Sequence, residues 1–253
     1  MNYKGYLIDL DGTLYRGTEL IETAKDFVGK LTAKNIPYVF LTNNATKSQE
    51  EAVQKVLDMG VETTARNMYT SSMATAAYVR EHHQGKKAYV IGTPSLKGIL
   101  LDAGIEMTEG EADLVIMGLD LEVNYEKLSH AALLIGGGAT FIATNPDKRF
   151  PTEKGIVPGN GAIQQVLVET TGVKPITIGK PSGFILDGAL KQLGLAKDEV
   201  ALIGDNYDTD ILTGINGGVD TIHVNTGVSR TGDVLKKDIP PTHTINNLSE
   251  WGV

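Results

Sequence analysis

The segment YLIDLDGTL at residues 6–14 decides the fold class of this 253-residue chain, because it places two carboxylates directly after an apolar run. Tyr6–Asp9 has the character of a buried strand. Residues two apart on an extended chain face the same side, so Asp9 and Asp11 point into one site while the residue between them faces the core. Gly12 lets the chain turn sharply behind them. We therefore expect a strand that ends in a paired-carboxylate site.

Short apolar runs alternate with helical stretches along the rest of the chain. The further expected strands are Tyr38–Thr42, Ala88–Ile91, Leu114–Met117, Phe141–Thr144, Ile176–Ile178, Val200–Ile203 and Thr221–Val224. The expected helices lie around 23–34, 46–59, 71–82, 94–102, 124–135, 160–171, 183–193 and 208–217. Alternation of this kind, with nearly continuous apolar strands, indicates parallel sheets covered by helices on both faces. The fold class is therefore α/β, with a Rossmann-like parallel-sheet core.

The strand ends divide the chain into two expected domains. Strands between about 87 and 145 end in Gly92, Gly118 and Asn145, with no acid at the tip. We therefore expect an inserted α/β cap domain over residues 83–177. Residues 1–82 and 178–253 would form a discontinuous catalytic core.

Polar residues follow four of the expected strands, where parallel sheets bind ligands. Besides the pair at Asp9 and Asp11, they are Thr42-Asn43-Asn44, Gly179-Lys180 and Gly204-Asp205. Hydroxyl, backbone N–H and ammonium groups can surround a phosphoryl group in transfer. Carboxylates without nitrogen or sulfur ligands favour a hard cation such as Mg²⁺. One carboxylate of the pair can attack phosphorus while the other protonates the leaving oxygen.

Each of these features also has a purely structural interpretation. An Asp-Gly pair can form a hairpin turn, and Asp208 or Asp210 can cap the helix expected to begin near them. A lone Lys is ordinarily a surface residue, and a lone Thr after a strand is ordinarily a helix cap. A calcium loop does not fit, because it needs Gly at the sixth position and Gly12 is fourth from Asp9. The shared placement at strand ends favours the catalytic interpretation.

Composition limits the class of protein. Hydrophobic residues make up 41% of the chain and charged residues 21%, as in ordinary globular proteins. The absence of cysteine excludes disulfides, zinc–thiolate sites and a cysteine nucleophile. The net charge of −8 argues against a nucleic-acid partner. No signal peptide or membrane-spanning run is apparent, so we expect a cytoplasmic enzyme without a membrane partner. A homodimer is left open.

The motifs resemble those of a known superfamily. DLDGT at 9–13, the strand-final Thr42, Lys180 in GKPS and GDNYDTD at 204–210 resemble, in order, the four motifs of the haloacid dehalogenase superfamily. LTNNAT, GKPS and the long insertion between Thr42 and Lys180 resemble its NagD-like and p-nitrophenylphosphatase branch, which carries a large α/β cap (C2-type). No motif position departs from the family pattern.

The resemblance implies a role for each motif residue. Asp9 would form an aspartyl-phosphate, and Asp11 would protonate the leaving group and then activate water. Thr42, the Asn43 backbone and the adjoining Asn44 would bind the phosphorylated substrate. Lys180 would neutralise Asp9 and the phosphoryl oxygens.

The resemblance also implies a metal site. Asp9, the carbonyl group of Asp11 and Asp205 would hold Mg²⁺, with Asp210 in support. Because a departing halide needs no proton, the presence of Asp11 disfavours a true dehalogenase.

The expected activity is therefore Mg²⁺-dependent hydrolysis of a small phosphorylated metabolite. The segment Asn145–Phe150 is either a solvated loop or a substrate-reading loop over the catalytic edge, in which Asn145 and Asp147 would contact substrate. A phosphotransferase or mutase on the same scaffold is the nearer alternative. A phospho-accepting signalling domain is the more distant one, because such a domain needs neither the insertion nor Asp11.

Overall fold

The computed structural model describes residues 3–152 and 154–253, and the chain divides into two compact units. Unit 1 contains Met1–Thr42, Gln49–Tyr69 and Lys180–Val253, and unit 2 contains Asn43–Ser48 and Thr70–Gly179. Residues 43–48, 70–82 and 178–179 thus group with unit 2, although the sequence placed them in the core. The reason is local, because the Ser71 hydroxyl bonds to the Asn43 carbonyl and the helix that begins at Ser71 packs on the next helix of unit 2.

Unit 1 is built on a six-stranded sheet in the order β14-β13-β12-β1-β4-β5. The strands are β1 (Gly5–Ile8), β4 (Tyr38–Thr42), β5 (Met68–Thr70), β12 (Val200–Gly204), β13 (Asp220–Val224) and β14 (His243–Ile245). β1 pairs in parallel with both β12 and β4, so it occupies the centre. A separate small hairpin joins β2 (Tyr15–Arg16) and β3 (Glu19–Leu20) directly after β1.

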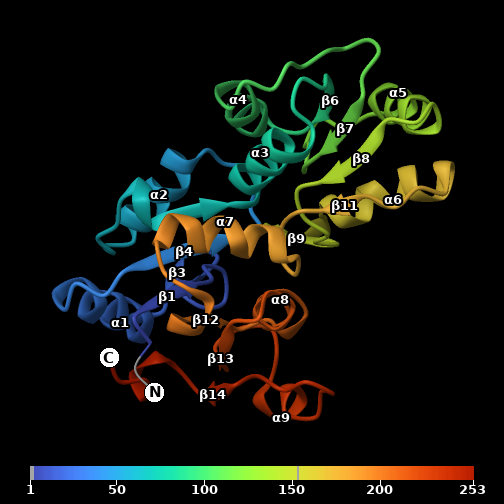
Figure 1. The fold of residues 1–253 in the computed structure, drawn as a ribbon. Coiled ribbons are helices and arrows are strands. Elements are labelled where there is room, and N and C mark those ends of the chain that lie inside the picture. The colour runs from blue at the N-terminus through green and yellow to red at the C-terminus, as the bar shows by residue number, and fades with distance from the viewer. Residues whose placement is uncertain (1–2, 153) are drawn as a thin grey trace. The chain divides into compact units, whose positions relative to one another are not determined.

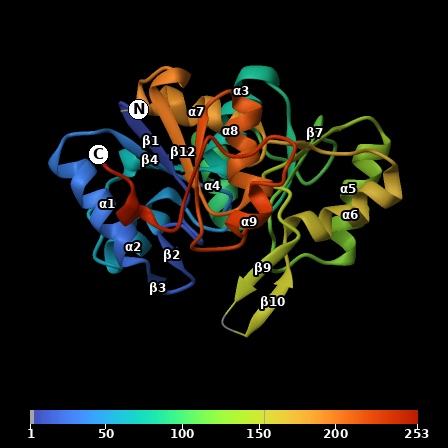
Figure 2. The same cartoon turned by 90° about the horizontal axis from the view of Figure 1, so that it is seen from below.

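Helices cover both faces of this sheet (Figure 2). They are α1 (Glu22–Ala33), α2 (Gln49–Asp58), α7 (Gly183–Leu193), α8 (Leu212–Gly217) and α9 (Thr231–Val234). The side chains of β1 alternate between the two faces of the sheet. Tyr6 and Ile8 pack with α1 and α2, whereas Leu7 points to the opposite side. The C-terminal tail closes the first face, where the indole N–H of Trp251 donates to the Tyr6 hydroxyl at 3.1 Å.

Unit 2 contains a second parallel sheet in the order β11-β8-β7-β6. The strands are β6 (Ala88–Ile91), β7 (Leu114–Met117), β8 (Thr140–Ala143) and β11 (Ile176–Thr177). The helices are α3 (Ser71–His82), α4 (Pro94–Asp102), α5 (Tyr125–Gly136) and α6 (Asn160–Thr171). The α5–α6 pair and the α3–α4 pair lie on opposite faces of the sheet (Figure 1). The expected α/β class with an inserted α/β domain is confirmed.

A β-hairpin that the sequence did not predict extends from unit 2 (Figure 2). It joins β9 (Arg149–Thr152) to β10 (Gly155–Pro158), and every residue of β10 is exposed. Arg149 and Phe150 therefore lie in a strand, and the loop expected over 145–150 is shorter. None of the side chains described in this hairpin is buried, so no alternating pattern marks it in the sequence.

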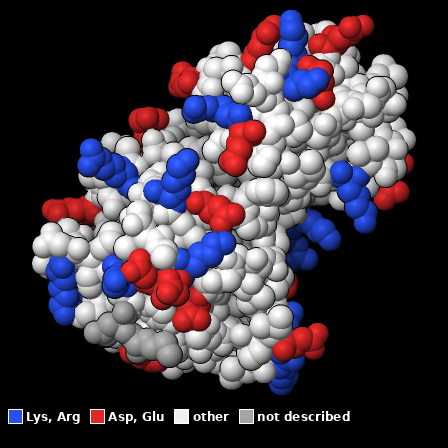
Figure 3. All heavy atoms as spheres, in the orientation of Figure 1, with Lys and Arg blue, Asp and Glu red and all other residues white. Residues whose placement is uncertain are grey.

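The surface carries mixed charge. Acidic and basic side chains are interspersed over the face drawn in Figure 3. Attraction of an anionic substrate must therefore come from charges inside a site, since exposed charges are screened beyond about 8 Å at physiological salt. Within residues 3–152 and 154–253, no helix combines the length and apolar character needed to cross a bilayer.

Candidate active site

Three adjacent strands of unit 1 bring the first group of predicted residues together. Asp9 follows β1, and its N–H donates to the Ile203 carbonyl of β12 at 2.9 Å, which continues the ladder by one residue. Thr42 is the last residue of β4, and Asp205 directly follows β12. Their side chains are buried, which ordinary turn or cap residues would not be. The expectation that these strand ends share one edge of one sheet is confirmed.

Lys180 joins this group through two buried ion pairs. Its Nζ lies 2.5 Å from Asp9 Oδ1 and 2.7 Å from Asp210 Oδ1. Burial alone would lower the pKa of Lys180, but the carboxylates of Asp210 and Asp9 outweigh it and raise the pKa above its ordinary value. The side chain is therefore a fixed ammonium rather than a surface lysine.

The origin of Lys180 differs from the expectation. The sequence placed it at the end of a strand in the same sheet as Asp9. The preceding strand, β11, instead pairs with β8 in the sheet of unit 2. Lys180 is the first residue of the returning unit 1 segment, on the short connection that precedes α7. Because β11 has only two residues, the sequence pattern could not show which of the two sheets it joins.

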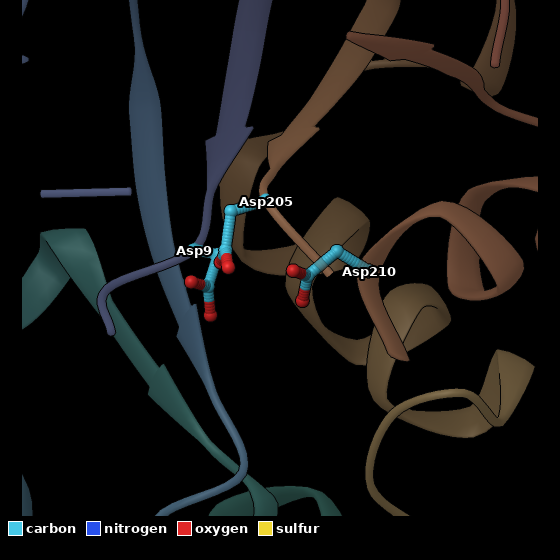
Figure 4. A group of neighbouring side chains, drawn as sticks. All are labelled: Asp9, Asp205 and Asp210. Atoms are coloured by element: carbon cyan, nitrogen blue, oxygen red, sulfur yellow. The ribbon is translucent and has the colours of Figure 1, made fainter. Parts of the chain in front are cut away.

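Asp9, Asp205 and Asp210 form a buried carboxylate cluster (Figure 4). One oxygen from each lies within 4.8 Å of the others. Burial, and then repulsion from Asp210, raises the pKa of Asp9 well above its ordinary value and that of Asp205 to about 7. Three carboxylates therefore face the single ammonium of Lys180.

This cluster fits a divalent hard cation. The Oδ2 atom of Asp9 is buried and has no hydrogen-bond partner within the described parts of the chain. A buried, unpaired carboxylate oxygen is costly unless a cation compensates it. The ligand set contains oxygen alone, which suits Mg²⁺ or Ca²⁺ rather than a soft metal.

Asp205 is held by a loop that the sequence did not single out. The Val228 N–H donates to Asp205 Oδ2 at 2.5 Å, and the Ser229 N–H donates to the Asp205 carbonyl at 3.2 Å. Thr226 connects this loop to the Asp9–Thr13 motif, because its hydroxyl donates to the Gly12 carbonyl at 2.6 Å. We call residues Asn225–Ser229 the clasp loop. Its only sequence signal was its position directly after an expected strand.

Two glycines leave room for the Asp205 carboxylate. A Cβ at Gly227 would lie 1.9 Å from Asp205 Oδ2, and one at Gly12 would lie 2.4 Å from Asp205 Cγ. Gly12 also has a φ of 93°, which side-chain-bearing residues rarely adopt. Both positions therefore require glycine, Gly227 for space alone and Gly12 for space and conformation.

Asp210 does not cap a helix, although the sequence left that interpretation open for Asp208 and Asp210. Asn206 is the capping residue, since its side chain accepts from the Asp208 N–H at 3.1 Å. Asp208 is exposed and lies 3.7 Å from Lys237. Asp210 is buried, and its Oδ2 accepts from the Asn206 N–H at 3.0 Å. The single helix expected over 208–217 is a π-helical turn at Tyr207–Ile211 followed by α8, and this turn points Asp210 inward.

Asp11 differs from Asp9 in its environment. Its side chain is exposed, whereas Asp9 is buried. Surrounding protein nevertheless displaces part of its water and raises the pKa of Asp11, while the ammonium of Lys55 acts in the opposite direction. Lys55 itself lies 3.7 Å from the centre of the Tyr15 ring. The two carboxylates of the motif therefore have different proton affinities and different access to solvent.

The remaining expected substrate contacts belong to unit 2. Asn43 Nδ2 donates to Asp147 Oδ1 at 3.2 Å, and Asn145 Nδ2 donates to the Asn43 carbonyl at 2.9 Å. Asn145 is buried, and its Oδ1 accepts from the Asp147 N–H at 3.1 Å. Asn44 Oδ1 accepts from the N–H and hydroxyl of Thr46. Asn145 thus uses both polar side-chain atoms inside unit 2, and a contact of Asn145 or Asp147 with substrate stays a prediction.

Comparison with known proteins identifies the family. Residues 6–106 match the haloacid dehalogenase-like hydrolase model, and residues 177–251 match one described as HAD-hydrolase-like. The chain is 49% identical to an acid sugar phosphatase of Staphylococcus aureus over 98% of its own length and 96% of that protein.

Two solved structures show the same fold. NagD from E. coli K-12 superimposes with a TM-score of 0.94 at 33% identity, covering 100% of this chain and 99% of NagD. A mutant of the thermostable p-nitrophenylphosphatase from Bacillus stearothermophilus gives a TM-score of 0.91 at 45% identity, covering 99% of this chain and 98% of that enzyme. The chain therefore belongs to the haloacid dehalogenase-like hydrolases and, within them, to the NagD-like phosphatases.

Proposed function

We propose that this phosphatase hydrolyses small phosphorylated metabolites in two steps through Asp9, with Mg²⁺ as cofactor. The observation that carries the proposal is the buried arrangement around Asp9. One oxygen of its carboxylate is bonded to the Lys180 ammonium, while the other is buried without a hydrogen-bond partner in the described chain, beside two more carboxylates. A structural aspartate has no need for this arrangement, whereas a nucleophile that must accept a phosphoryl group does.

In the first step, a carboxylate oxygen of Asp9 forms a bond to phosphorus as the bond from phosphorus to the leaving oxygen breaks. Asp11 gives its proton to that leaving oxygen. In the second step, Asp11 takes a proton from water, whose oxygen attacks phosphorus and releases Asp9. The exposed position of Asp11 supports this role, because the group must reach both a leaving group and water.

Thr42, the Asn43 backbone N–H and Lys180 would bind the phosphoryl oxygens. Thr42 ends the strand next to Asp9, and Lys180 already contacts the Asp9 carboxylate. Donors held in place before the reaction stabilise charge that develops on a phosphoryl group. Asn44 would contribute from the same segment.

Asp9, Asp205 and the Asp11 carbonyl would hold Mg²⁺, and Asp210 would support them by fixing Lys180. When bound, the cation offsets the negative charge of the carboxylates and of the phosphoryl group. The raised carboxylate pKa values and the unpartnered Asp9 oxygen support a cation at this place.

Unit 2 is proposed to act as the cap that chooses among phosphorylated metabolites. The chain first leaves unit 1 directly after Thr42, and after a return over Gln49–Tyr69 it finally re-enters unit 1 at Lys180. The acid sugar phosphatase of S. aureus makes sugar phosphates the first substrates to test.

A phosphate-release screen tests the proposal. Purified protein with Mg²⁺ is given sugar phosphates, nucleoside monophosphates and phosphorylated cofactors, and free phosphate is measured beside phosphate transferred to a second metabolite. Asp9→Asn should abolish release while the protein stays folded by circular dichroism. Asp208→Asn, which changes an exposed acid outside the cluster, is the matched control.

Three outcomes would count against the proposal. Release by Asp9→Asn at more than a few per cent of the wild-type rate would exclude the covalent mechanism. Transfer without release would indicate a phosphotransferase. No release from any class of substrate would refute the proposed substrate range.

A further inference from the structure

Two of the connections between the units are held by one short segment at the end of β8, Thr144–Asn145. The Thr144 carbonyl accepts from the Gly179 N–H at 2.9 Å, and Asn145 Nδ2 donates to the Asn43 carbonyl at 2.9 Å. Asn43 directly follows Thr42 in the chain, and Gly179 directly precedes Lys180. The same two residues therefore hold the backbone next to both proposed phosphate-binding side chains.

The Asn43 carbonyl is fully engaged. A carbonyl oxygen has two lone pairs, and here the second donor is the Ser71 hydroxyl at 2.8 Å. The side chain of the same residue is held as well, through its bond to Asp147 Oδ1. With its carbonyl and its side chain both fixed, Asn43 has little freedom to rotate, and its own N–H is oriented in consequence. The peptide plane also fixes the direction of the following N–H, that of Asn44.

Asn145 is itself rigid. Its side chain is 5% exposed, and its carbonyl accepts from Asn160 Nδ2 at 3.0 Å and from Gln164 Nε2 at 3.1 Å. Both of these donors come from α6. A side chain that binds a phosphoryl group would keep an N–H available for it. Asn145 instead directs its amide nitrogen to the Asn43 carbonyl and, at 3.4 Å, to the Thr144 hydroxyl, while its amide oxygen accepts from the Asp147 N–H.

The backbone at Gly179 is also tightly packed. A Cβ at Gly179 would lie 2.4 Å from the Thr144 carbonyl oxygen and 2.5 Å from Asn43 Oδ1. The two connecting segments therefore run against each other and against the end of β8, with no space for a side chain between them. Displacement of one segment would be transmitted to the other.

From these contacts we propose that Asn145 is a positioning residue, which holds the Thr42–Asn44 segment in its phosphate-binding conformation and does not itself contact substrate. The proposal rests on the phosphate-binding role proposed above for Thr42 and Asn43. On this proposal Asn145 does not make the expected contact with substrate. It affects phosphate binding through Asn43, and the effect is the same for every substrate because all of them carry the phosphoryl group.

The test compares Asn145→Ala and Ser71→Ala, which remove the two donors to the Asn43 carbonyl independently. Loss of one such hydrogen bond should weaken inhibition by inorganic phosphate and raise KM by a common factor of about 3 to 10. The ranking of at least three substrates with different leaving groups should not change. Asn124→Ala is the matched control, because that residue caps α5 through a 3.0 Å bond and does not touch Asn43.

Amide hydrogen exchange in the absence of phosphate provides a readout that does not depend on activity. Exchange in the segment 43–48 should accelerate in Asn145→Ala and Ser71→Ala but not in Asn124→Ala. If Asn145→Ala does not fold, Ser71→Ala carries the same test, because it acts on the same carbonyl.

A changed substrate ranking at constant phosphate affinity would overturn the proposal, since Asn145 would then contact the remainder of the substrate. Unchanged exchange in the segment 43–48 would overturn it as well. Wild-type protein that neither binds nor releases phosphate would instead refute the proposed function, while the exchange result would still report whether the contact restrains Asn43.

Discussion

Replacing Gly227 by Ala should damage the proposed metal site without replacing any of its ligands. The added Cβ would lie 1.9 Å from Oδ2 and 2.4 Å from Cγ of Asp205. Non-bonded carbon and oxygen atoms ordinarily stay more than about 3.3 Å apart, so either the carboxylate or the clasp loop must move by roughly 1.4 Å. Asp205 is 1% exposed, so its carboxylate cannot simply turn out into solvent. Movement of the clasp loop would instead break the Val228 and Thr226 hydrogen bonds.

The size of the effect follows from the tolerance of the site. Mg²⁺ demands nearly ideal octahedral geometry with ligands at about 2.0–2.1 Å. Disturbing groups that orient metal ligands typically costs about 10- to 100-fold in metal affinity, and a misplacement of about 1 Å near the reaction can cost about 100-fold in rate. We therefore expect the Mg²⁺ concentration for half-maximal activity to rise at least about tenfold in Gly227→Ala, with partial recovery of the rate at high Mg²⁺.

The assay is phosphate release titrated with Mg²⁺, together with direct calorimetric measurement of Mg²⁺ binding. Gly232→Ala is the matched control, because a Cβ there meets no atom within 4 Å. Gly12→Ala is a poorer probe, since its φ of 93° would add backbone strain to the collision. A Gly227→Ala protein with wild-type Mg²⁺ affinity would refute the reasoning, and a loss of rate without a change in Mg²⁺ binding would place the damage elsewhere.

Three further predictions concern the charges of unit 1. Lys180→Met should lower the free energy of unfolding of cation-free protein by about 3–5 kcal/mol, because it leaves buried carboxylates unpaired. Lys86→Met removes an exposed pair with Asp113 and should have little effect on that free energy. Equal losses in urea unfolding would contradict this prediction. Chelation of divalent cations should abolish phosphate release. Mg²⁺ should restore the release and Ca²⁺ should restore it poorly, because Ca²⁺ prefers longer bonds and more ligands. Full activity after exhaustive chelation would exclude a role for the cation in the reaction. Burial lowers the pKa of His223 below its ordinary 6.5, so the unfolded chain takes up this proton first and stability falls as the pH drops below about 6.5. His223→Gln keeps a donor for the Ser229 carbonyl and should reduce the dependence of the free energy of unfolding on pH by up to about 1.4 kcal/mol per pH unit in cation-free protein. If urea unfolding between pH 7.5 and 5 gives an unchanged pH dependence, His223 does not titrate in that range.

Several elements lie where the sequence predicted them because local signals define their ends. Leu114–Met117 is a continuous apolar strand, and both Asn160–Thr171 and Gly183–Leu193 have the expected bounds. The two helices end at Gly172 and Gly194, which adopt the left-handed conformation that glycine tolerates. Elements without such signals were missed, including the β9–β10 hairpin and the short edge strands β5 and β14.

Sequence alone determined that Asp9, Thr42 and Asp205 lie at the ends of buried parallel strands, because apolar runs and their polar ends are encoded within a few residues. Only the tertiary structure decided what surrounds these residues. Lys180 reaches Asp9 from the connection that follows β11, a strand of the other sheet. Gly227 makes room for Asp205, and Asn145 donates to the carbonyl of the residue after Thr42. Each of these contacts joins residues more than 20 positions apart, which no local periodicity describes. They arise from the packing of whole elements, and packing depends on all the residues of a unit at once.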